Sequence, residues 1–262
     1  LFLPHYMCPV QAQTPVVNAN EIVNVLSEYA EKSVFYEYEL VNQIAKSGQS
    51  ENIFRELEAK ADNHQLRARI YAIKAAVLYY EDVKPDYNSV EEHRASPPAK
   101  AEILALYVKA MNEAYVTGDD RLIAQTSIFY GQHCFVLKEL ELAVTYTMNG
   151  LELNEKLGIE NSPQDYMVVG EIFYKIREYS QCVKNSIKAF NIWQSGKERA
   201  DTIRMMFSSN TAALGYHRQQ QYDSAFFWYR ISLKMATALK LDVWNGIIGG
   251  NMGQVYYEQK KY

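Results

Sequence analysis

The chain has 262 residues, of which 48% are hydrophobic and 22% are charged, and its net charge is −4 at pH 7. This content is ample for a large core, and the length would allow one or two domains. No basic stripe is present, so we expect no nucleic acid as a partner of this segment. No run of about 20 apolar residues occurs, which argues against a membrane-spanning helix. Apolar residues recur at helical spacing without strict alternation, and this predicts an all-α fold.

The first 19 residues are apolar at the start and then turn polar. Val10 and Ala12 are small residues at the two positions that a signal peptidase reads, so one interpretation is the tail of a secretory signal. The other interpretation is a disordered or loosely packed terminus. The first interpretation predicts an extracytoplasmic, periplasmic location and the second a cytoplasmic one, and the residues leave both open.

Residues 20–118 are predicted to form helices of irregular length. Asn20 and Ser50 are suited to cap two of them, because their side chains can accept hydrogen bonds from the free amides of a first turn. Gly118 can close the last one, since glycine readily adopts the left-handed conformation that ends many helices. The expected helices cover 20–46, 50–61, 63–82 and 98–117, with a polar, proline-containing loop over 84–98.

From residue 119 onward one pattern repeats about every 40 residues. A small residue is followed three positions later by a bulky residue. A second bulky residue comes six positions after the first one, and a second small residue comes three positions after that. The first column contains Gly131, Gly170, Ala213 and Gly253, at spacings of 39, 43 and 40 residues. Such a period predicts stacked helix pairs that bury their small residues at close crossings. The expected helices cover 120–137, 140–157, 163–177, 180–195, 199–219, 223–240 and 242–259.

This pattern resembles the tetratricopeptide repeat (TPR). The best matches are "NTAALGYHRQQQYDSAFFWYRISLKMA" (Asn210–Ala236) and "GNMGQVYYEQKKY" (Gly250–Tyr262). The resemblance implies an all-α, right-handed, TPR-like α-solenoid of antiparallel helix pairs. We expect one array over 20–262, irregular over 20–118 and regular over 119–262. Its last repeat stops after one helix, which indicates a fragment of a longer protein.

No catalytic, metal or cofactor site is predicted. Gly249, Gly250 and Gly253 superficially resemble a phosphate-binding loop, but they fall inside a repeat helix. His133 and Cys134 are neighbours on a helix and therefore point about 100° apart, so they do not form a nucleophile and its base. No histidine pair has metal-ligand spacing. Cys134 and Cys182 occupy core columns, where we expect free thiols.

A partner-binding surface is what the resemblance implies instead. In this family the first helix of each pair lines a concave groove. The residues one, four and five positions after the small column point into this groove. The groove would lack the Lys/Asn/Arg cluster with which family members clamp a C-terminal carboxylate. A plain solvated face is the alternative for any single residue. The resulting candidates, which share their face with Glu258, are Gln132, Glu171, Tyr174, Lys175, His217, Arg218, Gln254 and Tyr257.

The leading hypothesis for function is a non-enzymatic interaction module. The resemblance implies the sensor region of a bacterial signalling protein, such as a membrane histidine kinase, that binds a protein or peptide partner. The alternative is a regulatory or oligomerisation region of a helix-turn-helix transcriptional regulator, in which the chain would form a homo-oligomer. An enzyme is the least favoured class, because no convergent set of reactive residues is apparent in the sequence.

Overall fold

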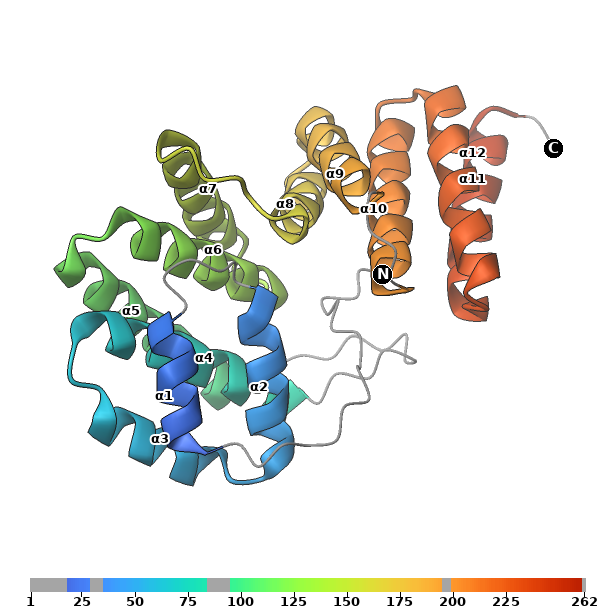
Figure 1. Ribbon diagram of the computed structural model, residues 1–262. Coiled ribbons are helices and arrows are strands. Elements are labelled where there is room, and N and C mark those ends of the chain that lie inside the picture. Colours follow the sequence, from blue (N-terminus) through green and yellow to red (C-terminus); the bar gives the residue numbers. More distant parts are fainter. Residues whose placement is uncertain (1–17, 29–34, 84–94, 195–198, 261–262) are drawn as a thin grey trace. The chain divides into compact units, whose positions relative to one another are not determined.

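The computed structural model describes residues 18–28, 35–83, 95–194 and 199–260. These residues form helices and no strand, which confirms the predicted all-α class (Figure 1). Contacts divide the chain into two compact units, residues 1–160 and 161–262. The division falls between the seventh and eighth helices and not at residue 119, where we expected regular repeats to begin.

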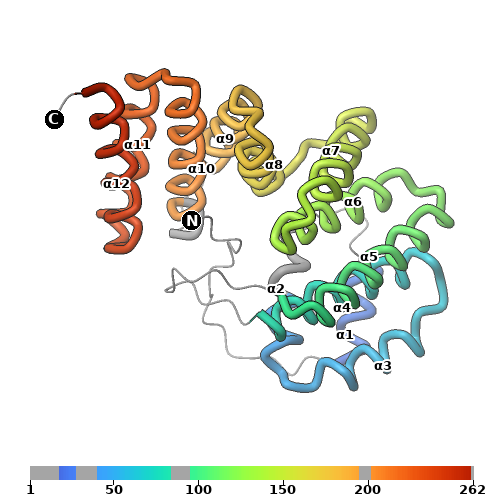
Figure 2. Tube along the Cα trace, turned by 180° about the vertical axis from the view of Figure 1, so that it is seen from behind, coloured from blue at the N-terminus to red at the C-terminus, as the bar shows by residue number. Residues whose placement is uncertain are grey.

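The described residues of unit 1 form seven helices, and the later helices pack as consecutive neighbours. The helix α4 packs along α5, and α6 packs along α7, while α6 also contacts α4 and α5 (Figure 2). The three N-terminal helices pack around α4. The bounds are α1 Ala19–Glu28, α2 Phe35–Ser47, α3 Ser50–Lys60, α4 His64–Val83, α5 Pro97–Thr117, α6 Asp120–Val136 and α7 Leu140–Lys156.

An aromatic cluster joins α4, α5 and α6 in the core of unit 1. The ring of Tyr107 stacks on Tyr130 with 4.9 Å between centroids, and it meets Phe129 edge-on at 6.0 Å. His133 lies against Tyr107 and against Tyr79, at 5.2 and 5.9 Å. Offset and edge-on arrangements of this kind are the favourable geometries for aromatic rings. His133 therefore serves as a core residue of α6.

Two expected helix caps are wrong, and one is confirmed. The side chain of Asn18, and not of Asn20, accepts a hydrogen bond from the Glu21 amide at 2.9 Å. Ser50 is the first residue of α3 and makes no capping bond. Gly118 ends α5 in the left-handed conformation, as predicted. The expected helix 20–46 is found as α1 and α2, and residues 29–34 between them lie outside the described residues, as do residues 1–17.

The described residues of unit 2 form five helices in a regular order. Helices α8 to α12 each pack on the next one along the chain, and α10 also contacts α8 and α12. Connections of three residues follow α8, α10 and α11, and a helix after so short a connection must fold back along its predecessor. All the bounds lie within two residues of those predicted. They are α8 Pro163–Lys175, α9 Tyr179–Trp193, α10 Arg199–Arg218, α11 Tyr222–Ala238 and α12 Asp242–Glu258.

The turns between helices share one backbone motif that the sequence pattern did not reveal. In several of these turns a left-handed residue follows the helix, and it is Lys138 after α6, Arg177 after α8 and Gln220 after α10. The next amide reaches back to a carbonyl in the last helical turn, as between Glu178 and Phe173 at 2.9 Å. These bonds satisfy carbonyls that a helix end would otherwise leave unpaired. The motif recurs at about the repeat spacing, although no glycine marks these three turns.

The small columns lie at close helix crossings, with one exception. A Cβ atom on Gly131 would lie 2.2 Å from the Thr147 hydroxyl oxygen and 2.6 Å from the Thr147 backbone nitrogen. On Gly170 it would lie 2.4 Å from the Ser186 hydroxyl oxygen. Gly253, the last member of the column, has nothing within 4 Å of that position. The pattern thus predicted two tight contacts correctly and, for Gly253, a contact that the described residues do not make.

Candidate functional site

The predicted site residues fall into two groups by burial. Gln132, Glu171 and His217 are only 5%, 1% and 4% exposed, so their side chains do not line an accessible surface as expected. Lys175, Arg218, Gln254 and Tyr257 are exposed, and Tyr174 is half-buried. Gln132 belongs to unit 1, and the other seven belong to unit 2. Because α10 contacts both α8 and α12, the accessible residues of unit 2 lie on neighbouring first helices.

Tyr174 and Arg218 connect α8 to α10. The Arg218 Nε donates a hydrogen bond to the Tyr174 hydroxyl oxygen at 3.2 Å. This hydrogen bond is the main reason why the pKa of Arg218 is raised. The two residues are 44 positions apart in the chain, so the repeat spacing brings equivalent ends of two helices together. The pair presents a fixed positive charge beside an aromatic ring at the surface of unit 2.

His217 and Gln254 meet at the Glu258 carboxylate, which connects α10 to α12. The His217 Nε2 lies 2.9 Å from one carboxylate oxygen, and the Gln254 amide donates to the other oxygen at 3.1 Å. The hydrogen bond from His217 is the largest cause of the lowered pKa of Glu258, and the charge of Arg218 lowers it further. Four of the eight predicted residues therefore belong to two linked contacts on neighbouring helices.

Tyr229 on α11 is a residue of this region that the sequence analysis missed. Its side chain is fully buried, and its hydroxyl has no hydrogen-bond partner among the described residues. Burial is the main cause of its raised pKa, and the charges of Arg218 and Glu258 also act on it. Tyr229 follows Ala225 by four positions, where the two preceding repeats have Thr147 and Ser186. This break in the column was the available signal.

The arrangement leaves several polar and aromatic groups accessible at the surface of unit 2. Arg218 makes a hydrogen bond only through Nε within the described residues, so its terminal nitrogens can donate to a carboxylate. Tyr174 and Tyr257 add aromatic surface, and Tyr257 is 72% exposed. We call Tyr174, Arg218, Gln254, Tyr257 and Glu258 the polar–aromatic face of unit 2. It offers charge-assisted hydrogen bonds beside rigid rings.

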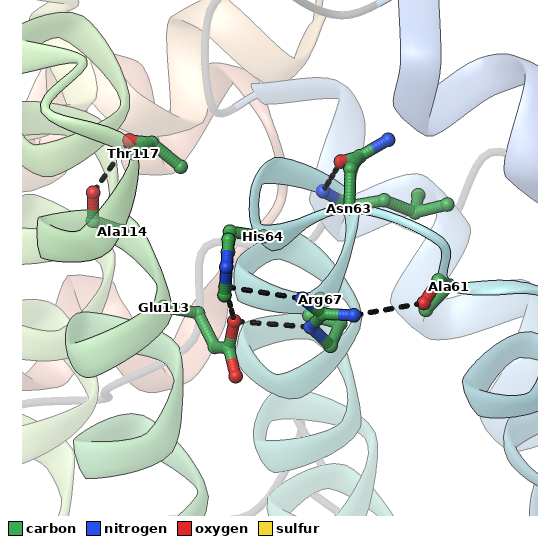
Figure 3. A network of polar contacts seen from close by, with 8 residues as sticks. Ala61, Asn63, His64, Arg67, Glu113, Ala114 and Thr117 are labelled. Atoms are coloured by element: carbon green, nitrogen blue, oxygen red, sulfur yellow. Dashed lines mark hydrogen bonds and ion pairs between the residues drawn. The ribbon is translucent and has the colours of Figure 1, made fainter.

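Unit 1 holds a separate polar network that the sequence analysis did not predict. The Glu113 carboxylate on α5 accepts hydrogen bonds from His64 Nδ1 at 2.6 Å and from Arg67 Nε at 3.1 Å (Figure 3). Arg67 also donates to the carbonyl of Ala61 before α4. Burial alone would raise the pKa of Glu113, but the hydrogen bonds and charges of His64 and Arg67 lower it. The network ties the start of α4 to α5, which is a structural role.

The two described cysteines are buried and free. Burial is the main cause that raises the pKa of each thiol to about 12. A thiol with this pKa stays protonated at neutral pH, whereas a nucleophile has to be a thiolate. Cys134 therefore lacks the reactive form that a catalytic role beside His133 would require. Cys8 lies outside the described residues.

Neither a metal-ion cluster nor a membrane-spanning helix occurs in the described part of the chain. No group of three His, Cys, Asp or Glu residues there is placed to hold a metal ion. No helix there combines the length and the apolar character needed to cross a membrane.

Comparisons with known proteins give a fold but no family. No protein-family model and no curated protein sequence matches the chain. The crystal structure of BtubC (BKLC) from P. vanneervenii is similar, with a TM-score of 0.58 and 17% sequence identity over 85% of this chain and 89% of that one. At this identity the likeness concerns the fold alone.

Proposed function

We propose that this chain is a non-enzymatic protein-interaction module in which the polar–aromatic face of unit 2 binds a segment of a partner protein. The observation that carries the proposal is the convergence of Tyr174, Arg218 and Glu258 from three successive first helices. Repeats that stack give equivalent positions on successive helices a common face, and such faces are suited to extended partners.

We further propose that the helices form a right-handed, TPR-like solenoid of antiparallel pairs. Three features support this. The small columns at Gly131 and Gly170 meet the following helix closely, the same left-handed turn recurs at the repeat spacing, and neighbouring first helices contact each other in unit 2. The array belongs, in this proposal, to a bacterial signalling protein with a sensor role. Flanking sequence that encodes a membrane span and a kinase domain would support this sensor role. Flanking sequence that encodes a helix-turn-helix domain would instead favour the alternative, a region of a transcriptional regulator.

Site-specific photo-crosslinking tests the binding face. A benzophenone amino acid is placed at Lys175 on α8 and, as a matched control, at Lys184 on α9, since both lysines are exposed. We expect a defined crosslinked partner from the source cell with the first variant and not with the second. Equal yields from both positions would contradict the proposed face.

Substitutions then test which groups bind the partner so identified. Arg218→Ala and Tyr174→Phe should each weaken binding, and the arginine change should cost at least about 2 kcal/mol if it is a hot spot. Lys234→Ala on α11 is the control, because this side chain is exposed on a second helix. Full affinity in both face variants together with a loss in the Lys234 variant would overturn the proposal.

A further inference from the structure

Two opposite charges of the polar–aromatic face lie on neighbouring helices without pairing. Arg218 on α10 donates from its Nε to the Tyr174 hydroxyl oxygen, and its two terminal nitrogens make no hydrogen bond or ion pair within the described residues. Glu258 on α12 accepts instead from His217, the residue before Arg218, and from Gln254. After these hydrogen bonds, which are the main causes, each charge also shifts the pKa of the other group, lowering that of Glu258 and raising that of Arg218. A charged donor and a charged acceptor are therefore both able to bind a further group.

A buried hydroxyl lies close to both charges. Tyr229 is on α11, which packs against α10 and α12 (Figure 1), and its side chain is 0% exposed. Its hydroxyl has no hydrogen-bond partner among the described residues. Burial is the main cause of its raised pKa, and the charges of Arg218 and Glu258 shift this pKa further in opposite directions. Because a buried hydroxyl without a partner destabilises a protein, this one indicates a site for a group that pairs with it, directly or through one water molecule.

The internal repeat shows that the hydroxyl of Tyr229 differs from its equivalents. The equivalent positions on α7 and α9 are Thr147 and Ser186. Their hydroxyl oxygens would lie 2.2 and 2.4 Å from a Cβ on Gly131 and Gly170, so these short side chains end at the crossing within their own helix pair. The longer side chain of Tyr229 carries its hydroxyl into the range of the charges on α10 and α12. A second helix thus adds a polar group to the polar–aromatic face.

The balance of charge decides which chemical group fits beside Arg218 and Glu258. A bound carboxylate would be attracted by the first and repelled by the second, and a bound ammonium group the reverse, so neither ion would gain enough to offset its lost hydration. A carboxamide is neutral and has both an acceptor and donors. Its oxygen can accept from the terminal nitrogens of Arg218 while its amino group donates to Glu258. The chain already shows the second contact, because the carboxamide of Gln254 donates to Glu258 at 3.1 Å.

We propose that Arg218, Tyr229 and Glu258 recognise the side-chain carboxamide of a glutamine or asparagine in the partner segment. We call these three residues the carboxamide site. The ligand oxygen accepts from the Arg218 guanidinium, the ligand amino group donates to the Glu258 carboxylate, and the Tyr229 hydroxyl gains its partner from the same group. This inference rests on the proposed function, because it names the group that the polar–aromatic face selects in the segment it binds.

Selection from a displayed library of random short peptides tests the proposal with a defined probe. The full chain is the bait, and the enriched peptides should share Gln or Asn at one position. The best peptide is then synthesised with the selected amide residue, with the corresponding acid, or with an apolar residue of the same size at that position. Fluorescence anisotropy measures the affinity of each form. The amide form should bind at least about tenfold more tightly than either of the others, which corresponds to about 1.4 kcal/mol.

Variants of the chain then test each group of the carboxamide site. Glu258→Gln removes the negative charge at nearly constant shape, so the acid form of the peptide should gain at least about tenfold relative to the amide form. Arg218→Ala should abolish the preference for the amide form, and Tyr229→Phe should weaken the amide form without affecting the apolar one. Lys234→Ala is the control and should leave all three affinities unchanged. Circular dichroism checks that every variant keeps its helix content.

The outcomes separate this inference from the proposed function. Peptides that need Arg218 but prefer the acid or the apolar form would overturn the inference and leave the proposed binding face standing. An unchanged preference in Glu258→Gln would overturn it as well, and an unchanged affinity in Tyr229→Phe would overturn the part assigned to that hydroxyl. Enriched peptides that bind Arg218→Ala and Tyr174→Phe as well as the unaltered chain, or no enriched peptide at all, would contradict the binding face and the inference with it.

Discussion

Replacing Gly170 with valine should destabilise unit 2, whereas the same change at Gly253 should not. A Cβ on Gly170 would lie 2.4 Å from the Ser186 hydroxyl oxygen, 3.2 Å from the Ser186 backbone nitrogen and 3.3 Å from the Cys182 carbonyl oxygen. The hydroxyl can rotate away, but the backbone atoms of α9 cannot, so the two helices must separate. Such overpacking costs about 1–3 kcal/mol. Helix propensity returns only a few tenths of a kcal/mol when valine replaces glycine, so we expect a net loss of about 2 kcal/mol.

Urea unfolding followed by tryptophan fluorescence measures this loss in the relevant unit, because Trp193, Trp228 and Trp244 all lie in unit 2. Gly253→Val is the matched control: the residue belongs to the same column, has nothing within 4 Å, and should give an unchanged or slightly higher midpoint. Adding Ser186→Ala to Gly170→Val should restore part of the loss, since one of the three close atoms is removed. Equal midpoints for the Gly170 and Gly253 variants would refute the assignment of the small column to helix packing.

Three further changes test other features. Arg177 has a φ of 67°, a conformation that costs an L-residue about 1–2 kcal/mol, so Arg177→Gly should raise the urea midpoint or leave it unchanged, and Arg177→Val should lower it. The pKa of Glu258 is lowered from 4.5, first by its hydrogen bond to His217. The ionised Glu258 carboxylate therefore contributes fully to stability above pH 4.5, and this contribution is lost as the pH falls through the folded-state pKa. The midpoint of the unaltered protein should thus fall more steeply below about pH 4.5 than that of Glu258→Gln, and parallel curves would contradict the assignment. Cys134 and Cys182 should resist a thiol reagent at neutral pH until the chain is unfolded, because burial raises both pKa values to about 12; rapid reaction of either in the folded protein would show that it is accessible.

The helices of this protein could be predicted from local signals. Gly118 after α5 and the Ser162-Pro163 start of α8 act within a few residues of themselves, so the chain carries these signals without any tertiary contact. The periodic small residues predicted which helix positions face a neighbour, because a close crossing excludes large side chains. The predicted caps at Asn20 and Ser50 were wrong, since another polar residue, Asn18, or no side chain at all performs that role.

The candidate site was only partly predictable. The repeat register placed Tyr174, His217, Arg218 and Gln254 on related helix positions, and the structure joins them in pairs. The repeat register could not predict that His217 is buried while Arg218 beside it is exposed, because the exposure of these side chains depends on how closely α12 and α8 approach α10. Tyr229, whose hydroxyl has no hydrogen-bond partner among the described residues, was not predicted either, although the break in its column was a signal.

The sequence by itself determined the ends of the helices after residue 95 to within two residues, which columns are small, and that Cys134 and Cys182 belong to the interior. These properties follow from the conformational and steric preferences of single residues repeated at a fixed period. Only the tertiary structure decided that Gly131 and Gly170 meet a partner helix within contact distance while Gly253 faces open space, and that one carboxylate, Glu258, gathers His217 and Gln254. The physical reason is that contacts between residues some 40 positions apart depend on the distances between packed helices, and no local preference specifies those distances.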